Sequence, residues 1–186
     1  MSTTSRPFGL RPAFSPMGVI RPTAYTIASG YAANILENQP VLIAANGTLE
    51  AAPVGARFIG TFSGVEFTDL DGRRRVSNKW ISGTAGTDIV AYATLDPTLT
   101  YEIQANGPIA VTDIGSQADF TTIGTGSLVT GLSTMMLDTA TLTNSASAAV
   151  RIVGIPTGPD NTPGDAFTRV LVQVSEHQNV ADRVAY

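Results

Sequence analysis

The sequence contains no cysteine and a single histidine, His177, in 186 residues. Without thiols, the chain has no disulfides, no thiolate nucleophile and no thiolate zinc site. A histidine-based dyad or triad would have to use His177, and a site with two histidines from one chain is impossible. The neighbouring Ser175 and Glu176 would alternate faces on a strand. We therefore expect His177 to be structural or incidental.

Charged residues are also scarce, at 14% of the chain, where about a quarter is usual. Glycine, threonine and serine replace them, which is typical of turn-rich β proteins. No apolar run approaches the roughly 18 residues of a membrane-spanning helix, so we expect no membrane span, and we expect no secretory signal. The hydrophobic fraction of 43% supports a sizeable core, and the length favours one domain over two very small ones.

The net charge of −4 is unevenly distributed along the chain. Residues 1–36 contain Arg6, Arg11 and Arg21 and no acid, so they carry +3. The other 150 residues carry eight bases and fifteen acids, which gives −7. Ten of the eleven basic residues are arginine, the cation suited to buried and interface pairing. This bias favours protein contacts over a nucleic-acid surface.

The strand pattern is strongest between residues 57 and 80. Large and small residues alternate on one face, and other apolar residues occupy the opposite face: Phe58, Gly60, Phe62 and Gly64, then Ile59, Val65 and Phe67. Asp69, Asp71 and Gly72 are turn formers at the break between the two strands. A four-residue loop there would place Val65 opposite Val76 and Glu66 opposite Arg75. We therefore predict a long central hairpin.

Further short strands with turn signals between them extend along the chain. We expect strands at residues 25–28, 40–44, 48–51, 88–94, 100–105, 149–155 and 167–174. The pair Asn46-Gly47 is a strong hairpin signal. In residues 100–105, strict alternation predicts Tyr101 and Ile103 inward and Glu102 and Gln104 outward.

Three segments fall outside this pattern. Residues 112–120 are the best helix candidate, at one or two turns with Thr112 as the N-cap. Residues 121–147 form a long excursion, rich in threonine, serine and glycine, with one or two short strands expected. Residues 176–186 fit either a tail or a short helix. About ten strands and almost no helix predict an all-β fold: a single-domain β-sandwich or barrel at 23–186, an extended N-terminal arm at 1–22, and at most one or two short helical turns.

The predicted arm is interrupted by four prolines, which exclude a long helix. Apolar residues alternate with its three arginines. A disordered terminus is one interpretation, although such tails usually contain fewer apolar side chains. An arm that orders against a neighbouring subunit is the other. It makes partner-contact candidates of Arg6, Phe8, Leu10, Arg11, Phe14 and Arg21.

The run Arg73-Arg74-Arg75 is the one basic cluster. One interpretation is a solvated hairpin end that forms ion pairs with the acidic body. A docking contact to another protein is the second, and nucleic acid the third. Single-strand binders interleave aromatic side chains with their cations, and this run has none. We retain Arg73, Arg74 and Arg75 as partner-contact candidates and expect no nucleic-acid partner.

Motifs for catalysis or cofactor binding are missing. Asp69-x-Asp71-Gly72 resembles a calcium loop, but Arg73 and Trp80 stand where an EF-hand requires oxygen ligands. Dinucleotide, phosphate-loop and nucleophile-elbow motifs do not occur. Asp160 and Asp165 could bind a cation at a loop, but acids of this kind are ordinary in polar loops. Trp80 with Tyr92 or Tyr101 would offer a sugar platform, but core positions suit all three. We expect no enzyme, no cofactor and no metal.

Several segments carry a resemblance: residues 26–31, 62–69, 89–92, 101–105, 124–127, 130–133 and 176–178. They resemble core and turn motifs of the small capsid cement (decoration) proteins of tailed bacteriophages, especially short-tailed phages. Gly9-Leu10-Arg11-Pro12 is similar to the Gly-Leu/Phe-Arg-Pro element near the start of that family. The chain departs from the pattern at Arg73–Arg75 and at Met135-Met136.

This resemblance implies a β-sandwich that trimerises on the outer surface of an icosahedral head and reinforces it. The implied partners are the major capsid protein and further copies of the chain, with no catalytic residues and no cofactor. Two other classes remain open. One is a virion-surface module that binds a host receptor or host-surface glycan, and the other is a small β-fold hydrolase.

Overall fold

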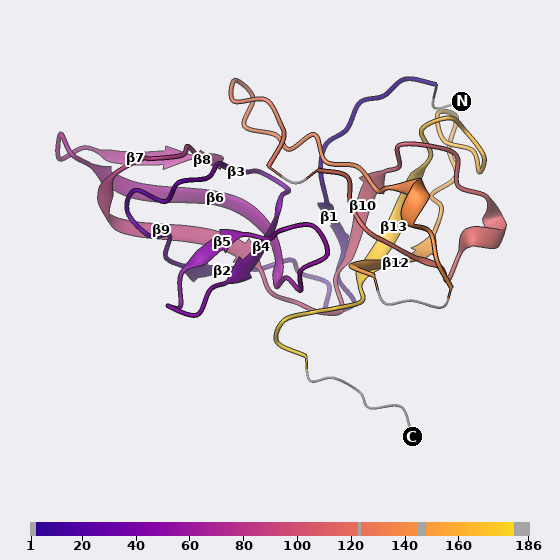
Figure 1. Cartoon of the computed structure of the whole chain (residues 1–186), viewed down its shortest axis with the longest axis horizontal. Helices are drawn as coiled ribbons and strands as arrows, with labels where there is room; N and C mark the ends of the chain where they lie inside the picture. The colour runs from indigo at the N-terminus through magenta and orange to yellow at the C-terminus, as the bar shows by residue number, and fades with distance from the viewer. Residues whose placement is uncertain (1–2, 123, 145–147, 181–186) are drawn as a thin grey trace.

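A computed structural model of the chain describes residues 3–122, 124–144 and 148–180, and its regular structure is almost entirely antiparallel β-strand (Figure 1). One sheet has the order β1-β10-β13-β12-β11. Its strands are Arg11–Phe14, Thr100–Gln104, Arg169–Val174, Val150–Gly154 and Gln117–Ala118. The predicted all-β, sandwich-like fold is confirmed.

A second sheet has the order β2-β9-β6-β4-β5, with β7 also paired to β6. These strands are Pro22–Tyr25, Gly86–Thr94, Gly60–Asp69, Pro40–Ile43, Leu49–Ala51 and Arg74–Ser77. A third, two-stranded sheet joins β3 (Ile35–Leu36) to β8 (Lys79–Trp80). Figure 1 shows the second sheet at one end of an elongated molecule and the first sheet at the other.

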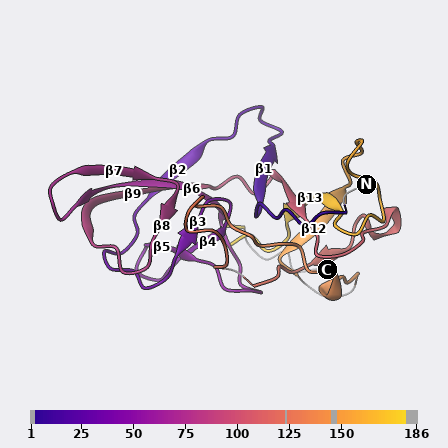
Figure 2. The same ribbon diagram turned by 90° about the horizontal axis from the view of Figure 1, so that it is seen from above.

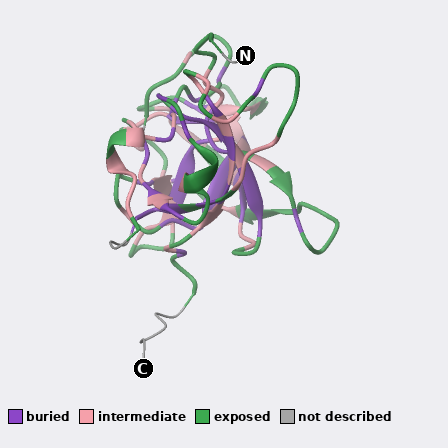
Figure 3. Ribbon diagram, turned by 90° about the vertical axis from the view of Figure 1, so that its right-hand side faces the viewer, coloured by how far each residue is buried: buried purple, intermediate pink, exposed green. Residues whose placement is uncertain are grey.

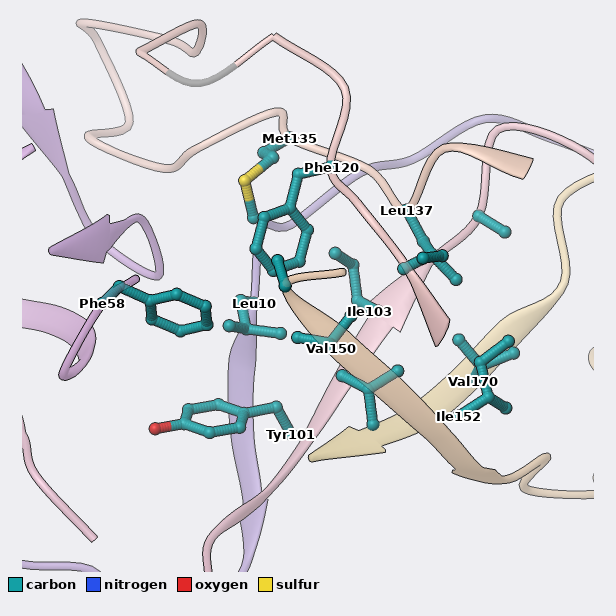
Figure 4. Close-up of a cluster of buried hydrophobic side chains, with 14 of the residues drawn as sticks. Leu10, Phe58, Tyr101, Ile103, Phe120, Met135, Leu137, Val150, Ile152 and Val170 are labelled. Atoms are coloured by element: carbon teal, nitrogen blue, oxygen red, sulfur yellow. The ribbon is translucent and has the colours of Figure 1, made fainter. Parts of the chain in front are cut away.

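The first and second sheets each cover a hydrophobic core, and the small third sheet contributes Ile35 and Trp80 to the second core. The core at β10, β12 and β13 contains Phe58 and Phe120, whose ring centroids lie 5.8 Å apart (Figure 4). The core at β6 and β9 contains Phe62 and Trp80. Many buried residues lie in strands, and the surrounding loops are largely exposed (Figure 3), but β1, β2 and β7 are mostly exposed as well. Since the chain has few charges, these two cores are the main source of its stability.

The two cores are joined by adjacent residues and by buried hydroxyl groups. Phe58 packs in the first core, while the next residue, Ile59, packs in the second. The hydroxyl of Thr94 lies 3.0 Å from the Tyr101 hydroxyl and accepts a hydrogen bond from the Thr61 amide at 2.8 Å. The ends of the two sheets are therefore held together by direct contacts.

The central hairpin is present, but its register differs from the prediction by one residue. Val65 pairs with Ser77, and Glu66 pairs with Val76. The loop has three residues instead of four, because the Asp69 amide donates to the Arg73 carbonyl at 2.9 Å. Gly72, at φ +74°, supplies the left-handed residue that such a loop requires.

A β-bulge changes the faces of β6. From Phe62 to Gly64, β6 advances by two residues, while its partner β9 advances by only one, from Ala93 to Tyr92. An extra residue shifts the alternation of side chains, so Phe62 and Val65, expected on opposite faces, pack in the same core. At the start of the strand, a Cβ on Gly60 would lie 2.1 Å from the Thr94 carbonyl oxygen. Only glycine permits this approach of β6 to β9.

Strand β10 confirms three of its four predicted directions. Tyr101 and Ile103 are buried, and Glu102 lies on the other face. Gln104 is buried as well, contrary to the prediction. The N-terminal segment covers it: the Arg6 amide donates to Gln104 Oε1 at 2.8 Å, and Gln104 Nε2 donates to the Thr4 carbonyl at 3.3 Å. Alternation along one strand cannot reveal a distant segment of this kind.

The predicted helix at 112–120 is wrong. The segment contains a single 3₁₀ turn, Val111–Asp113, followed by β11. The turn begins after Ala110, whose amide donates to Asp113 Oδ2 at 2.7 Å, so Thr112 is not the cap. Pairing of β11 with β12 takes the second half of the segment into the sheet.

The excursion at 121–147 is more buried than its composition indicates. Its described residues contain the 3₁₀ turn Thr139–Thr141 and isolated bridges, without the short strands that we expected. Met135 and Leu137 lie fully buried in the first core. Of the predicted tail or helix, residues 176–180 form neither helix nor strand, and residues 181–186 lie outside the described part.

The segment predicted as an arm is part of the protein's own fold. Strand β1 pairs with β10, Arg11 opposite Glu102, and β2 pairs with β9. Leu10 is completely buried beside Phe58 (Figure 4). Residues 8–14 therefore order against their own chain.

Candidate partner-binding surface

The N-terminal candidates Phe8 and Arg11 are held by groups of the same chain. The Arg11 guanidinium lies over the Phe8 ring, 4.7 Å from its centroid, and forms an ion pair with Glu102. Glu102 also forms an ion pair with Arg169, whose Nη1 lies 3.6 Å from Glu102 Oε1. Two guanidinium groups thus share one largely buried carboxylate, which fixes their positions. Leu10 is unavailable to a partner, because it is buried.

A pocket of about 450 Å³ lies beside this ion-pair group. Its walls include Arg6, Phe8, Arg11, Gln104, Asp160 and Arg169. The pocket brings three of the predicted partner-contact residues together. Its three cations are partly balanced by Asp160 and Glu102, so the pocket favours small anionic groups weakly.

The most exposed apolar residues of the N-terminal region lie in the connection between β1 and β2. Phe14 is 61% exposed, Met17 82% and Val19 55%, with Ile20 and Arg21 exposed beside them. This connection stands out from the body of the molecule (Figure 2). Phe14 and Arg21 were predicted partner contacts, and the structure leaves both accessible.

This connection is anchored at one residue. The Ser15 hydroxyl donates to Asp96 Oδ2 at 3.1 Å and accepts from the Met17 amide at 3.2 Å. The Gly18 amide then donates to the Ser15 carbonyl at 2.9 Å, which closes a turn. The hydrogen bonds from Thr98 and Ser15 lower the pKa of Asp96, with the Thr98 hydroxyl the larger cause, so Asp96 stays an acceptor at neutral pH. The apolar side chains are thus presented on an ordered turn.

The arginines of the central hairpin pair with its own acids. Arg74 Nη2 lies 3.2 Å from Glu66, and Arg75 Nε lies 3.3 Å from Asp69. The expected pair of Glu66 with Arg75 is therefore replaced, because the register is shifted by one residue. A hydrogen bond from Tyr92 at 2.6 Å, followed by one from Arg74, lowers the pKa of Glu66. Arg74 and Arg75 therefore form ion pairs within the hairpin and not with the acidic body of the protein.

Arg73 is exposed and forms no ion pair within the described residues. The hairpin of β6 and β7 lies at the far end of the second sheet, away from β1 (Figure 1). Apart from the buried Leu10, the predicted contact residues therefore lie on two separate surfaces, one around the N-terminal segment and one on this hairpin.

Ser15, Asp96 and His177 are of the residue types found in a catalytic triad, but they do not form one. Ser15 donates to Asp96 rather than to His177. His177 Nε2 lies 2.8 Å from the Ile59 carbonyl, and Nδ1 accepts from the Asn179 amide at 3.1 Å. Both ring nitrogens bind backbone, so the imidazole has no free position for a serine proton. The structural role expected for His177 is confirmed.

The other candidate sites are also resolved by burial and distance. Trp80 and Tyr101 are buried, so the sugar platform considered from the sequence is not formed. Among the described residues, no three histidine or acidic side chains are grouped to hold a metal ion. Within the same part of the chain, no helix is long and apolar enough to cross a membrane.

No family model, curated protein or solved structure matches this chain. Met17 and Val19 are not among the partner contacts predicted from the sequence. The turn signal Pro16-Met17-Gly18 between two short strands would have identified them. Leu128 and Val129, exposed in the excursion, carried no comparable signal.

Proposed function

We propose that this protein is a non-enzymatic cement protein of a tailed phage, which binds the outer surface of the icosahedral head as an oligomer and reinforces it. Its partners are the major capsid protein and other copies of the chain, as a trimer. The observation that carries the proposal is the exposed apolar turn of residues 14–21. Together with the resemblance of the core and turn segments, this turn supports docking on a protein surface.

The turn suits binding because it is already ordered before a partner binds. Burial of apolar surface contributes about 25 cal/mol per Å², so Phe14, Met17, Val19 and Ile20 together offer a few kcal/mol. The Ser15–Asp96 hydrogen bond fixes the turn beforehand, which reduces the entropy lost on binding. In a trimer, three such turns would engage one shell, and multivalency would raise the effective affinity.

The charged residue of the turn is also consistent with a protein partner. Arg21 lies at its end and is exposed, so it is available to a carboxylate on the shell. Ser15 donates to Asp96, while both ring nitrogens of His177 are bonded to backbone. The three residues therefore form no catalytic triad, which supports a role in which no bond is made or broken. Reinforcement of a shell requires contacts of this kind and no chemistry.

Co-sedimentation with phage heads that lack the protein tests the proposal. Deletion of residues 1–22 is unsuitable, because it would remove Leu10 from the core. The informative variant is Met17→Ser/Val19→Ser/Ile20→Ser, which changes only exposed side chains. The matched control is Val111→Ser/Ile114→Ser, which removes exposed apolar residues elsewhere.

We expect the control to bind the heads like the unmodified protein and the turn variant to lose at least tenfold in affinity, with unchanged melting temperatures. Full-strength binding by the turn variant would refute this docking surface. Failure of the unmodified protein to bind any such head would refute the function.

A further inference from the structure

We infer that the outer edge of β7 accepts an extended, acidic segment of a partner protein as an additional strand. This surface is separate from the turn of residues 14–21 and does not depend on the proposed function. It is defined by β7, Arg74–Ser77, the hairpin loop before it, and the groove beside it.

The backbone of β7 has an open hydrogen-bonding edge. The Asp69 amide donates to the Arg73 carbonyl, so these two residues form a hydrogen-bonded pair. Such pairs alternate along an antiparallel ladder, and Arg75 and Ser77 therefore bond to β6. Arg74 and Val76, opposite Thr68 and Glu66, direct their N–H and C=O groups away from β6. No strand of the described chain pairs with that side.

The side chains beside this edge are unusually exposed for their type. Val76 is 81% exposed, and Leu70, in the loop, is 80% exposed. A groove of about 510 Å³ runs next to β7, and its walls include Phe67, Trp80 and Ile81. A strand added to β7 would cover Val76 with the side chains of one face and place those of the other face over the groove.

The charge of the hairpin indicates which kind of partner segment would bind beside β7. Residues 66–80 carry four cations against three carboxylates, a net +1, in a chain whose remainder carries −5. The groove is bounded by Arg75 and Lys79, and Lys79 Nζ donates to the Leu128 carbonyl instead of a carboxylate. Arg73 lies on the same face as Arg75, since side chains two apart share a face. Carboxylates over the groove would therefore meet Arg73, Arg75 and Lys79, against one acid on the groove wall, Asp69, which is paired with Arg75.

The same cations argue against a second copy as the occupant. Pairing β7 with β7 of another copy would bring two arginine runs together, and like charges opposite each other destabilise a sheet. Charged residues on an exposed edge normally prevent unwanted strand pairing. Here they exclude basic and self-complementary strands and leave an acidic strand as the favoured partner.

The probe is the peptide acetyl-Glu-Val-Glu-Val-Glu-Val-Glu-amide, in which carboxylates occupy one face and valines the other. The decisive variant is Val76→Pro. Proline removes the outward N–H and is tolerated on an edge strand whose N–H faces solvent, so the β6–β7 ladder stays intact. Val76→Thr is the matched control, because it keeps the amide. Arg73→Glu reverses a charge that forms no ion pair within the described residues and so tests the electrostatic part without touching the backbone.

Binding is followed by the NMR amide signals of Arg74 and Val76 during titration with the peptide. We expect saturable shifts with the unmodified protein and with Val76→Thr, and at least tenfold weaker binding with Val76→Pro and with Arg73→Glu. The same peptide with glutamine in place of glutamate should also bind at least tenfold more weakly.

Three results would overturn the inference. They are no binding of the acidic peptide at millimolar concentration, equal binding by Val76→Pro, and equal binding of the glutamine peptide. Concentration-dependent pairing of the protein through β7, abolished by Val76→Pro, would also overturn it, because the occupant would then be a second copy. None of these results bears on head binding through residues 14–21, which is measured with other variants.

Discussion

His177 Nε2 donates a hydrogen bond to the carbonyl oxygen of Ile59 at 2.8 Å, across 118 residues of sequence. The Asn179 amide donates to Nδ1, so the ring is held as the neutral tautomer with its proton on Nε2. The bond attaches the segment after β13 to the start of β6, where the two cores meet. Protonation of Nδ1 would break the Asn179 contact.

We predict that this histidine makes stability depend on pH. Burial lowers the pKa of His177 below its ordinary value of 6.5, only partly offset by the backbone hydrogen bonds and by Asp96. The unfolded chain therefore binds a proton more readily than the folded protein. The contribution is complete above about pH 6.5 and is lost as pH falls from there through the lower folded pKa. Denaturant unfolding at a series of pH values measures it.

The variant His177→Gln isolates this effect. A glutamine amide can still donate to the Ile59 carbonyl but does not titrate, so the slope between about pH 7 and 5 should disappear. The lowered pKa values of Glu66 and Asp96 act at more acidic pH and should persist in the variant. An unchanged slope in His177→Gln would show that other groups cause it.

Leu10→Ala should destabilise the protein by about 2–5 kcal/mol, as buried leucine truncations do. Leu10 is fully buried in the first core, in a segment whose prolines predict an arm. Phe14→Ala is the matched control, since Phe14 is exposed four residues away, and it should change stability by about 0.5 kcal/mol or less. Urea unfolding measures both. Equal, small effects would mean that Leu10 does not belong to the core.

Phe62→Ala should cost on the order of 3–5 kcal/mol. The side chain is fully buried in the core at β6 and β9. A loss below about 1 kcal/mol in denaturant unfolding would contradict the placement of β6.

The protein should be a homotrimer in solution. In the excursion at 121–147, Met135 and Leu137 are buried, but Leu128, Val129 and Leu132 are exposed apolar residues that a subunit interface would cover. A stable interface needs roughly 1,000 Å² or more. Light scattering at micromolar concentration should give three times the chain mass of 19.4 kDa. A monomer mass would exclude the trimer.

Treatment with a chelator should change the melting temperature by no more than about two degrees, because no metal is expected to stabilise the fold. The two candidate acids have other surroundings: Asp160 lines the arginine pocket, and Asp165 Oδ2 accepts from the Thr162 amide at 2.9 Å. A large decrease with EDTA, reversed by added calcium, would instead indicate a cation site at these loops.

Local pattern was sufficient for much of the fold. Alternation of apolar and polar residues predicted β10, β12 and β13, and Asn46-Gly47 predicted the hairpin of β4 and β5. These signals work because each strand buries one face and each tight turn needs particular residues. The absence of cysteine and the single histidine likewise restricted the possible chemistry directly.

The sites were harder to predict than the strands. Phe14, Arg21 and Arg73 were selected from composition and remain accessible. Leu10 was selected for the same reason but is buried, because other residues of the first core pack against it. Composition identifies apolar residues, but it does not identify their neighbours.

The amino-acid sequence by itself determined the class of fold, the positions of the main strands and the lack of thiol chemistry, since these depend on residues close together in the chain. Tertiary structure decided the rest. It placed β1 on β10, buried Gln104 under the N-terminal segment, and shifted the hairpin register through a three-residue loop. It also bound both nitrogens of His177 to backbone from different parts of the chain. Each of these depends on contacts between distant segments, whose energies are set only when the whole chain packs.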